Sequence, residues 1–207
     1  MTQLLPPPLG VAGLAGWLAL DYRAHLQAGE TVLVLGAGGS AGQLAMQSAR
    51  VLGAGLVVGA ARGKDLPHVA GLADAVVELA DEQTIEAGLA AAAPGGYDVI
   101  IDFLWGGVAP HAMNHAKPGG RYIQVGNSAG AASTITGLVL RNKLLTLMGH
   151  SLFATLAEVR RSAYAQMAGH ANDGKFTMDL EQTRLADISG TWEHLKTGAS
   201  RKLVVTP

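Results

Sequence analysis

The sequence predicts an α/β protein: a Rossmann-type, doubly wound parallel sheet of about six strands, with an N-terminal helix and a C-terminal α/β tail. Residues 31–35 form a short apolar, β-branched run, which is typical of a strand buried on both faces of a sheet. A glycine-rich turn follows directly, and from Ala41 onward apolar and small residues recur at helical spacing until Gly53. Further apolar runs then alternate with helical patterns, as expected of βαβ units.

The chain of 207 residues divides into three expected parts. Residues 1–30 are the lead-in helix with its flanking residues, and the proline triplet at 6–8 favours an extended start before that helix. Residues 31–150 are the dinucleotide-binding Rossmann domain. Residues 151–207 are a C-terminal tail that combines helices with a strand.

The bounds of the expected elements follow from the apolar patterns and from glycine and proline breaks. Strands are expected at 31–35, 56–60, 75–79, 97–102, 121–125, 144–148 and 202–206. Helices are expected at 11–26, 41–52, 82–93, 133–142, 154–170 and 188–196, with a short one near Asp65 and one that carries His111 and His115. Ser133 is the expected N-cap of its helix, and residues 117–120 are expected to close the helix before the fifth strand.

The glycine-rich turn predicts a pyrophosphate site. Glycines let the backbone approach a phosphate, and the following helix start presents free N–H groups and about half a positive charge. The pattern departs from the usual fingerprint, because Gly36 and Gly38 are followed by Ala41, whereas Gly36, Gly39 and Gly42 form a second register. The expected cofactor contacts here are Gly36, Gly38, Gly39, Ser40, Ala41 and Gly42. The alternative is a merely structural α/β turn.

The end of the second strand indicates which dinucleotide binds. An NAD site usually has an acidic residue about 20 residues beyond the glycines, where it binds the ribose 2′-hydroxyl. Here residues 59–61 are Gly-Ala-Ala, and two cations, Arg62 and Lys64, follow. This favours the 2′-phosphate of NADPH, since each charge-assisted contact contributes about 1.5–3 kcal/mol. Alternatively, Arg62 and Lys64 only solvate the loop and cap the helix near Asp65.

The carboxyl ends of the later strands are where the nicotinamide end of a dinucleotide would lie, because ligands of open α/β sheets bind beyond those ends. Asp102 ends the fourth strand and is followed by Phe103 and Leu104, so these three residues are expected to approach the cofactor, and Gly126, Asn127 and Ser128 follow the fifth strand. Phe103, Gly126, Asn127 and Ser128 are therefore candidate cofactor contacts. Asp102 could bind a ribose, but a carboxylate that holds the next loop is the favoured interpretation.

Metal chemistry has little support in the sequence. His111 and His115 stand four residues apart, a spacing that can hold a metal, but no third ligand is nearby and no HExxH motif occurs. A solvated helix face is the favoured interpretation of the two histidines. The chain has no cysteine, which removes Cys-ligated zinc, thiolate chemistry and disulfides. No metal site is expected.

The overall composition argues against several classes of partner. Charged residues make up 15% of the chain and the net charge is −1, so no electrostatic argument favours nucleic acid or a membrane surface. No apolar run of about 20 residues occurs, and no basic segment precedes an apolar one at the N-terminus, so we expect a cytoplasmic protein. The expected edge strand from Leu144 to Met148 is apolar, which predicts a homodimer paired across it.

Several segments, taken in order, resemble the zinc-independent quinone oxidoreductase branch of the medium-chain dehydrogenase/reductase superfamily. The segments are PLGVAGLAGW at 8–17, LQAGETVLV at 26–34, GAGGSAG at 36–42, DVIID at 98–102, KPGGR at 117–121, VGNS at 125–128 and KLVVTP at 202–207. They cover nearly the whole chain, and the ordered set is far more specific than any one motif.

The resemblance implies NADPH as cofactor and hydride transfer to an electron-poor C=C or C=O group, as in a quinone or an enone. It implies that residues 39–42 meet the pyrophosphate, that Arg62 or Lys64 meets the 2′-phosphate, and that Phe103 with residues 126–128 meets the nicotinamide end. No residue stands out as the general acid, so the catalytic residues remain unassigned.

Members of that superfamily carry a GroES-like domain before the Rossmann domain, and this chain starts where that domain would end. The resemblance therefore implies a truncated protein whose tail, residues 151–207, would pack on a catalytic domain absent here. One alternative is an NADPH-binding module with little or no catalysis of its own. Another is a methyltransferase, which the missing acid at 59–61 argues against.

Overall fold

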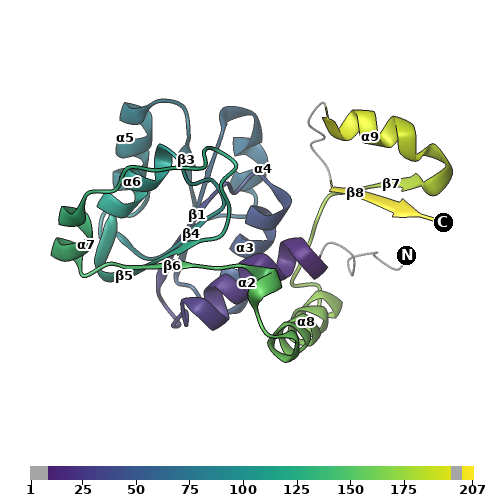
Figure 1. The fold of residues 1–207 in the computed structure, drawn as a ribbon, viewed down its shortest axis with the longest axis horizontal. Coiled ribbons are helices and arrows are strands. Elements are labelled where there is room, and N and C mark those ends of the chain that lie inside the picture. The colour runs from purple at the N-terminus through teal and green to yellow at the C-terminus, as the bar shows by residue number, and fades with distance from the viewer. Residues whose placement is uncertain (1–8, 197–201) are drawn as a thin grey trace.

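The computed structural model describes residues 9–196 and 202–207. Its centre is a six-stranded parallel sheet with the strand order β3-β2-β1-β4-β5-β6 (Figure 1). The strands are β1 (Thr31–Leu35), β2 (Leu56–Ala61), β3 (Ala75–Glu78), β4 (Tyr97–Asp102), β5 (Ala116–Gln124) and β6 (Thr146–Gly149). Because the strand order reverses between β1 and β4, the predicted doubly wound sheet is confirmed.

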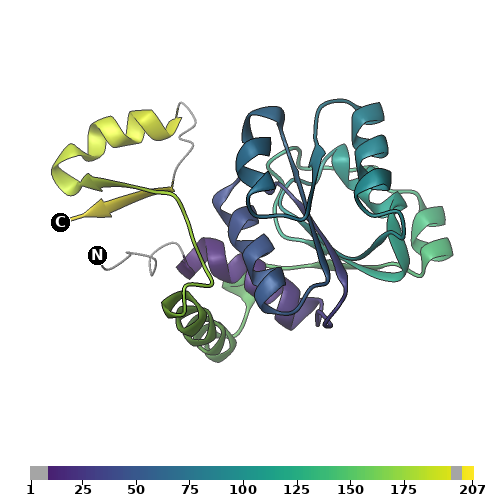
Figure 2. The same cartoon turned by 180° about the vertical axis from the view of Figure 1, so that it is seen from behind.

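Helices cover both faces of the sheet (Figures 1 and 2). The helices of the described residues are α2 (Leu14–Leu18), α3 (Ser40–Val51), α4 (Leu66–Ala70), α5 (Glu82–Ala92), α6 (Val108–Asn114), α7 (Gly137–Lys143), α8 (Ala157–Asn172) and α9 (Ile188–Lys196), of which α8 packs on α2 and α9 belongs to the tail. The π-helical turns η1 (Leu9–Gly13) and η2 (Ala19–Arg23) flank α2, and the 3₁₀ turns are η3 (Gly63–Asp65), η4 (Leu152–Ala154) and η5 (Leu185–Asp187). Within the described ranges, no helix has the length and hydropathy that a membrane span requires.

The side chains of β1 explain why the sheet has a helical layer on each face. Leu33 and Leu35 join a core with residues of α5 and α6, against which residues of α7 also pack. Val32 and Val34 belong to a second core with residues of η2, α3 and α4. All four side chains are fully buried. Since successive strand residues face opposite sides, a strand that is apolar throughout needs cover on both faces.

A third core joins the N-terminal helical segment to the start of the tail. The segment runs from Leu9 to Arg23, shorter than the expected 11–26, and its Trp17 is 1% exposed. Trp17 shares this core with Leu44 of α3 and Met167 of α8. The helix of the tail therefore packs on the sheet domain through α2.

The fifth strand starts earlier than predicted. Ala116 pairs with Tyr97, the register then shifts, and regular pairing resumes where Val99 faces Arg121. Residues 117–120, which were expected to close a helix, are therefore an irregular part of the strand, and Gly119 takes a φ of 76° there. The prediction missed this because a proline and two glycines are typical of turns, whereas a bulged strand tolerates them.

The segment between β5 and β6 also differs from the prediction. Helix α7 begins at Gly137 with Thr136 at its N-cap position, so the expectation that Ser133 caps this helix was wrong. The helix ends at Leu144, whose φ of 50° is left-handed, and β6 therefore starts at Thr146 rather than at 144. As predicted, β6 is an edge of the sheet.

The last part of the tail forms a small unit of its own. The prediction missed β7 (Leu180–Arg184), which pairs in parallel with the predicted strand β8 (Lys202–Thr206). Its sequence, LEQTR, is mostly polar and shows no apolar run. Helix α9 contacts both strands, and both views show this unit to one side of the sheet domain (Figures 1 and 2).

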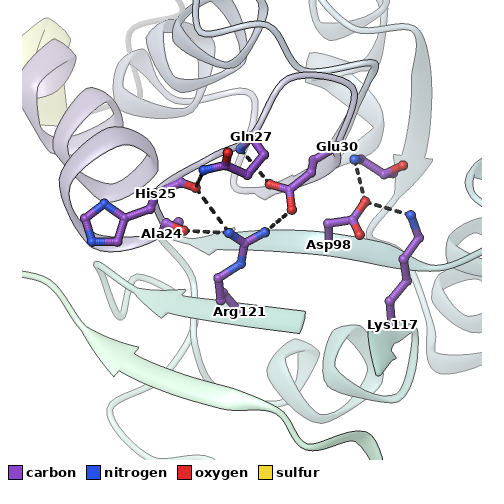
Figure 3. A network of polar contacts seen from close by, with 8 residues as sticks. Ala24, His25, Gln27, Glu30, Asp98, Lys117 and Arg121 are labelled. Atoms are coloured by element: carbon purple, nitrogen blue, oxygen red, sulfur yellow. Dashed lines mark hydrogen bonds and ion pairs between the residues drawn. The ribbon is translucent and has the colours of Figure 1, made fainter. Parts of the chain in front are cut away.

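A polar network ties β1, β4 and β5 together at the amino edge of the sheet (Figure 3). Arg121 of β5 forms an ion pair with Glu30, which directly precedes β1. Asp98 of β4 accepts a hydrogen bond from the backbone N–H of Thr31 at 2.8 Å and pairs with Lys117 at 2.7 Å. These contacts hold the three central strands in register, and the opposite, carboxyl edge is left to the loops.

Candidate functional site

A pocket of about 670 Å³ lies at the carboxyl edge of the sheet. Its walls come from the β1–α3 turn, the β2–α4 loop, α5, the loops after β3, β4 and β5, and the start of α6. Ten predicted cofactor contacts line it: Gly36, Gly38, Gly39, Ser40, Ala41, Gly42, Arg62, Lys64, Phe103 and Ser128. The fold thus brings the glycine turn, the basic loop and the rim of β4 to one cavity.

The β1–α3 turn is so tight that glycine is required at two positions. Gly36 takes a φ of 85°, which is left-handed and strained for other residues. A β-carbon on Gly42 would lie 2.2 Å from the Gly36 carbonyl oxygen, so no side chain fits there. In contrast, a β-carbon on Gly39 would meet only that same oxygen, at 3.6 Å, which is ordinary contact. The room at Gly39 is therefore available to a ligand.

The first turn of α3 opens onto the pocket. Gly39 is its N-cap residue and offers no side chain, and the first turn has no acidic residue. The N–H groups at the start of a helix have no carbonyl partner within the helix, and the helix dipole adds about half a positive charge. Ser40, Ala41 and Gly42 in that turn line the cavity, so this wall suits an anion.

The β2–α4 loop adds positive charge to the pocket. Arg62 and Lys64 line it, and both are exposed. Neither takes part in an ion pair within the described part of the chain. The nearby Glu78 at the end of β3 lies against Gly63, because a β-carbon built there would be 2.9 Å from Glu78 Oε1. The two cations are thus free to bind an anionic group.

Asp65 lines the pocket, although the sequence analysis did not name it as a candidate cofactor contact. It lines the cavity next to the glycine turn, and a β-carbon on Gly38 would lie 2.8 Å from Asp65 Oδ2. The prediction looked for an acid directly after β2 and found Ala60 and Ala61 there. The turn η3 brings the acid back from four residues beyond the strand.

Asp102 holds the loop after β4 and does not line the pocket. Its Oδ1 accepts hydrogen bonds from the backbone N–H groups of Leu104 and Trp105, at 2.7 and 2.9 Å. Its Oδ2 accepts one from the Tyr122 hydroxyl at 2.6 Å. Burial raises the pKa of Asp102, and these three hydrogen bonds act in the opposite direction. The favoured interpretation, a structural carboxylate, is confirmed by these contacts.

Of the residues predicted to contact the nicotinamide end of the cofactor, only some line the pocket. Phe103 and Ser128 line the pocket, and the Ser128 hydroxyl donates to the Phe103 carbonyl at 3.0 Å. Gly126 and Asn127, the other predicted contacts at this end, are not among the residues that line the pocket. Gly126 packs behind Phe103, since a β-carbon on it would lie 2.7 Å from the Phe103 carbonyl oxygen. Asn127 is exposed.

Apolar residues form the rest of the pocket wall, and the prediction missed them. They are Ala61, Leu79, Ile85, Val108 and Ala129, and Leu104, which was predicted to approach the cofactor, lines the pocket with them. Leu79 follows β3 at the same edge of the sheet and could have been found by the rule that identified Phe103. Ile85 and Val108 lie on helices, and nothing in their local pattern distinguishes them from core residues.

Comparison with known families places this geometry in context. A sequence model of the zinc-binding dehydrogenase family matches residues 41–169, which include most of α3, the basic loop and the rim of β4. The chain belongs to this family. The predicted membership of the medium-chain dehydrogenase/reductase superfamily is thereby confirmed.

Individual relatives match more of the chain than the family model does. It is 30% identical, over 96% of its length, to a protein of Emericella nidulans described as a probable NADPH-dependent quinone reductase. It is 28% identical over 92% of its length to an NAD-dependent alcohol dehydrogenase of Sulfolobus acidocaldarius. The chain spans 62% and 54% of those two relatives.

A solved member of the superfamily has the same fold. The crystal structure of an alcohol dehydrogenase superfamily protein from Novosphingobium aromaticivorans matches 94% of this chain with a TM-score of 0.79. The two sequences are 26% identical, and the chain covers 60% of that structure. The match extends beyond the sheet domain into the tail.

The family description mentions zinc, but this chain has no cysteine to ligate it. Of the residues that the structure describes, no group of three or more His, Asp or Glu side chains could hold a metal ion. The residues present therefore do not fit a zinc ion, and no step of the chemistry is assigned to one.

His111 and His115 do not form the solvated helix face that was predicted. They belong to the contact between α5 and α6. Glu86 of α5 binds both, with Oε1 2.5 Å from His111 Nδ1 and Oε2 2.7 Å from His115 Nε2. Although burial acts the other way, the hydrogen bonds and charges of these histidines leave the pKa of Glu86 below its usual value. This carboxylate therefore joins α5 to α6.

Proposed function

We propose that the chain is the nucleotide-binding part of an NADPH-dependent oxidoreductase that reduces quinones or enones. The observation that carries the proposal is that the start of α3 and two cations, Arg62 and Lys64, which form no ion pair with the described residues, line one and the same pocket. A volume of about 670 Å³ lies within the range of about 300–1,000 Å³ that is typical of small-molecule sites. The family membership supports the same function.

The residues present fit a dinucleotide phosphate. Gly39 leaves room for a phosphate at the start of α3, and Gly42 lets the backbone close beneath it. Arg62 and Lys64 supply charge-assisted donors for a 2′-phosphate. The bound nucleotide would supply the hydride, which is chemistry that the cofactor brings with it.

The chain's own part in the reaction is to bind, orient and exclude water. Backbone N–H groups of the first turn of α3 hold the pyrophosphate, and the wall of Phe103, Leu104 and Val108 keeps water from the far end of the pocket. The Asp102 carboxylate fixes that wall through its bonds to the backbone.

A second candidate is a binding module with little catalysis of its own. The polar side chain on the Phe103 wall of the pocket is Ser128, and its hydroxyl proton is used in the bond to the Phe103 carbonyl. The described lining thus offers no free proton donor at that end. This observation favours binding without rapid turnover for the chain by itself.

One experiment tests both candidates. NADPH is titrated while nicotinamide fluorescence is recorded, and reduction of a simple quinone is followed in parallel. Binding with turnover supports the oxidoreductase, and binding without turnover supports the module. Absence of binding would overturn both, since each requires the dinucleotide site.

The preference for NADPH rests on the basic loop and has its own test. Replacing both cations, Arg62→Ala with Lys64→Ala, is expected to weaken NADPH binding at least tenfold more than NADH binding, because only NADPH carries the 2′-phosphate. Equal losses for the two nucleotides would mean that Arg62 and Lys64 only solvate the loop.

We further propose that the protein works without zinc, in the cytoplasm, and as a homodimer paired along β6.

A further inference from the structure

Asp65 occupies an unexpected position for an acid in a site proposed to bind NADPH. Its backbone N–H donates to the Arg62 carbonyl at 2.9 Å, which turns the chain back toward the sheet. The carboxylate then lies against the glycine turn, so close that a β-carbon on Gly38 would be 2.8 Å from Oδ2. It lines the same cavity as Arg62 and Lys64.

The Asp65 carboxylate has no structural role in the described residues. It is the N-cap residue of α4, yet its side chain makes no capping hydrogen bond. No ion pair joins it to Arg62, Lys64 or any other cation in the part of the chain that the structure describes. The pocket is thus lined by two unpaired cations and one unpaired anion.

The anion and the two cations favour different groups at the 2′ position of the adenosine ribose. A carboxylate accepts hydrogen bonds from a ribose 2′-hydroxyl, which is how NAD sites recognise their cofactor. The same carboxylate repels a 2′-phosphate, since like charges in contact are unfavourable. Arg62 and Lys64 favour the phosphate for the converse reason.

We propose that Asp65 is a cofactor-specificity residue: its carboxylate binds the ribose 2′-hydroxyl of NADH and opposes the 2′-phosphate of NADPH, so that the site accepts both nucleotides. Gly38 supports this role, because only a residue without a side chain leaves room for the carboxylate beside the turn. The inference rests on the proposed dinucleotide function. It adds recognition of NADH, whereas the cations directly after β2 favour NADPH.

The test compares Asp65→Asn with the wild-type chain by fluorescence titration of NADH and NADPH, which requires no turnover. The wild type is expected to bind both. Asp65→Asn is expected to raise the ratio of the NADH to the NADPH dissociation constant about tenfold or more. The variant removes the charge that repels the 2′-phosphate of NADPH, and it also removes the charged acceptor for the 2′-hydroxyl of NADH. Asp65→Ser serves as a second variant if the first does not fold, as judged by circular dichroism.

The matched control is Glu78→Gln. It removes the same charge from a carboxylate that lies beside the loop, at Gly63, but does not line the pocket. This control is expected to leave the ratio within about twofold. An unchanged ratio in the folded Asp65 variant, or an equal shift in the control, would overturn the role of Asp65. Wild-type chain that binds neither nucleotide would instead overturn the proposed function, and the specificity role with it.

Discussion

The buried carboxylate of Asp102 supports the pocket through three hydrogen bonds without lining the cavity itself. It fixes the backbone of Leu104 and Trp105, and Leu104 is part of the pocket wall. Its partner Tyr122 is also buried, and burial together with the charge of Asp102 raises the pKa of that phenol. The free energy of unfolding is therefore expected to depend on the hydrogen bond between Tyr122 and Asp102.

Tyr122→Phe is expected to lower the free energy of unfolding by about 1–3 kcal/mol, because Asp102 Oδ2 would lose the hydroxyl it binds at 2.6 Å. Tyr97→Phe is the matched control: the Tyr97 hydroxyl is equally buried but donates to a neutral carbonyl, that of Leu89, at 2.9 Å. We expect this control to lose about 0.5–1.5 kcal/mol. Urea unfolding measures both, and a loss at Tyr122 no larger than at Tyr97 would contradict the assigned role of the carboxylate.

The glycine turn separates a binding effect from a folding effect. Gly39→Val is expected to keep the fold but to weaken NADPH binding at least tenfold, since its side chain would occupy the space at the start of α3. Gly42→Ala is expected to destabilise the chain itself, because its β-carbon would lie 2.2 Å from the Gly36 carbonyl oxygen. Thermal unfolding and NADPH titration separate the two, and unchanged affinity in the Gly39 variant would make the turn merely structural.

At the scale of elements, strand β6 differs from the strands inside the sheet. It is an edge, so one row of its backbone groups lacks a partner strand in the monomer. Its Leu147 is 39% exposed and the preceding Leu144 is 74% exposed. A second copy of the chain paired along β6 would cover both the backbone and these side chains.

Sedimentation is expected to show a dimer at micromolar concentration, because pairing along β6 hides the exposed edge. Leu147→Lys is expected to shift the chain to monomer, since a lysine on an edge strand opposes strand addition. Leu185→Lys is the control, because Leu185 is 61% exposed but lies in the tail. A monomeric wild type, or dimers that persist in the Leu147 variant, would exclude this interface.

At the scale of the whole molecule, a buried histidine couples stability to pH. His150 follows β6 and is 7% exposed, and its Nε2 has no hydrogen-bond partner among the residues that the structure describes. Burial, with the Arg23 guanidinium beside it as a second cause, lowers the pKa of His150 to about 4. The folded chain therefore keeps this histidine neutral at a pH where the unfolded chain protonates it, near 6.5.

The free energy of unfolding is expected to fall by about 2–3 kcal/mol as the pH drops from about 6.5 to about 4, because only the unfolded state takes up the proton in that range. Above pH 6.5 this contribution is constant. Urea unfolding across pH 4–7 measures the slope, and His150→Gln is expected to remove this part of it. The same slope in that variant would assign the acid sensitivity to other groups.

Much of the fold was predictable because local sequence and tertiary packing agree. The run at 31–35 is apolar at every position, which only a strand with helices on both faces accommodates, and β4 and α9 have the predicted bounds. Strand β7 was missed because its polar sequence carries no pattern of its own, and it pairs with β8 about 20 residues later. Likewise, 117–120 has the composition of a turn but lies in a strand because Ala116 pairs with Tyr97.

The sequence by itself determined the order of strands and helices, the glycine turn and the basic residues after β2, because each depends on residues adjacent in the chain. Only the tertiary structure decided which of these segments share a cavity, that Asp65 returns to the turn beside Gly38, and that Gly126 packs behind Phe103. The physical reason is that contacts between distant segments depend on backbone path and burial, neither of which is encoded in a local pattern. The chemistry of the pocket thus depends on the folded arrangement as much as on the motifs that line it.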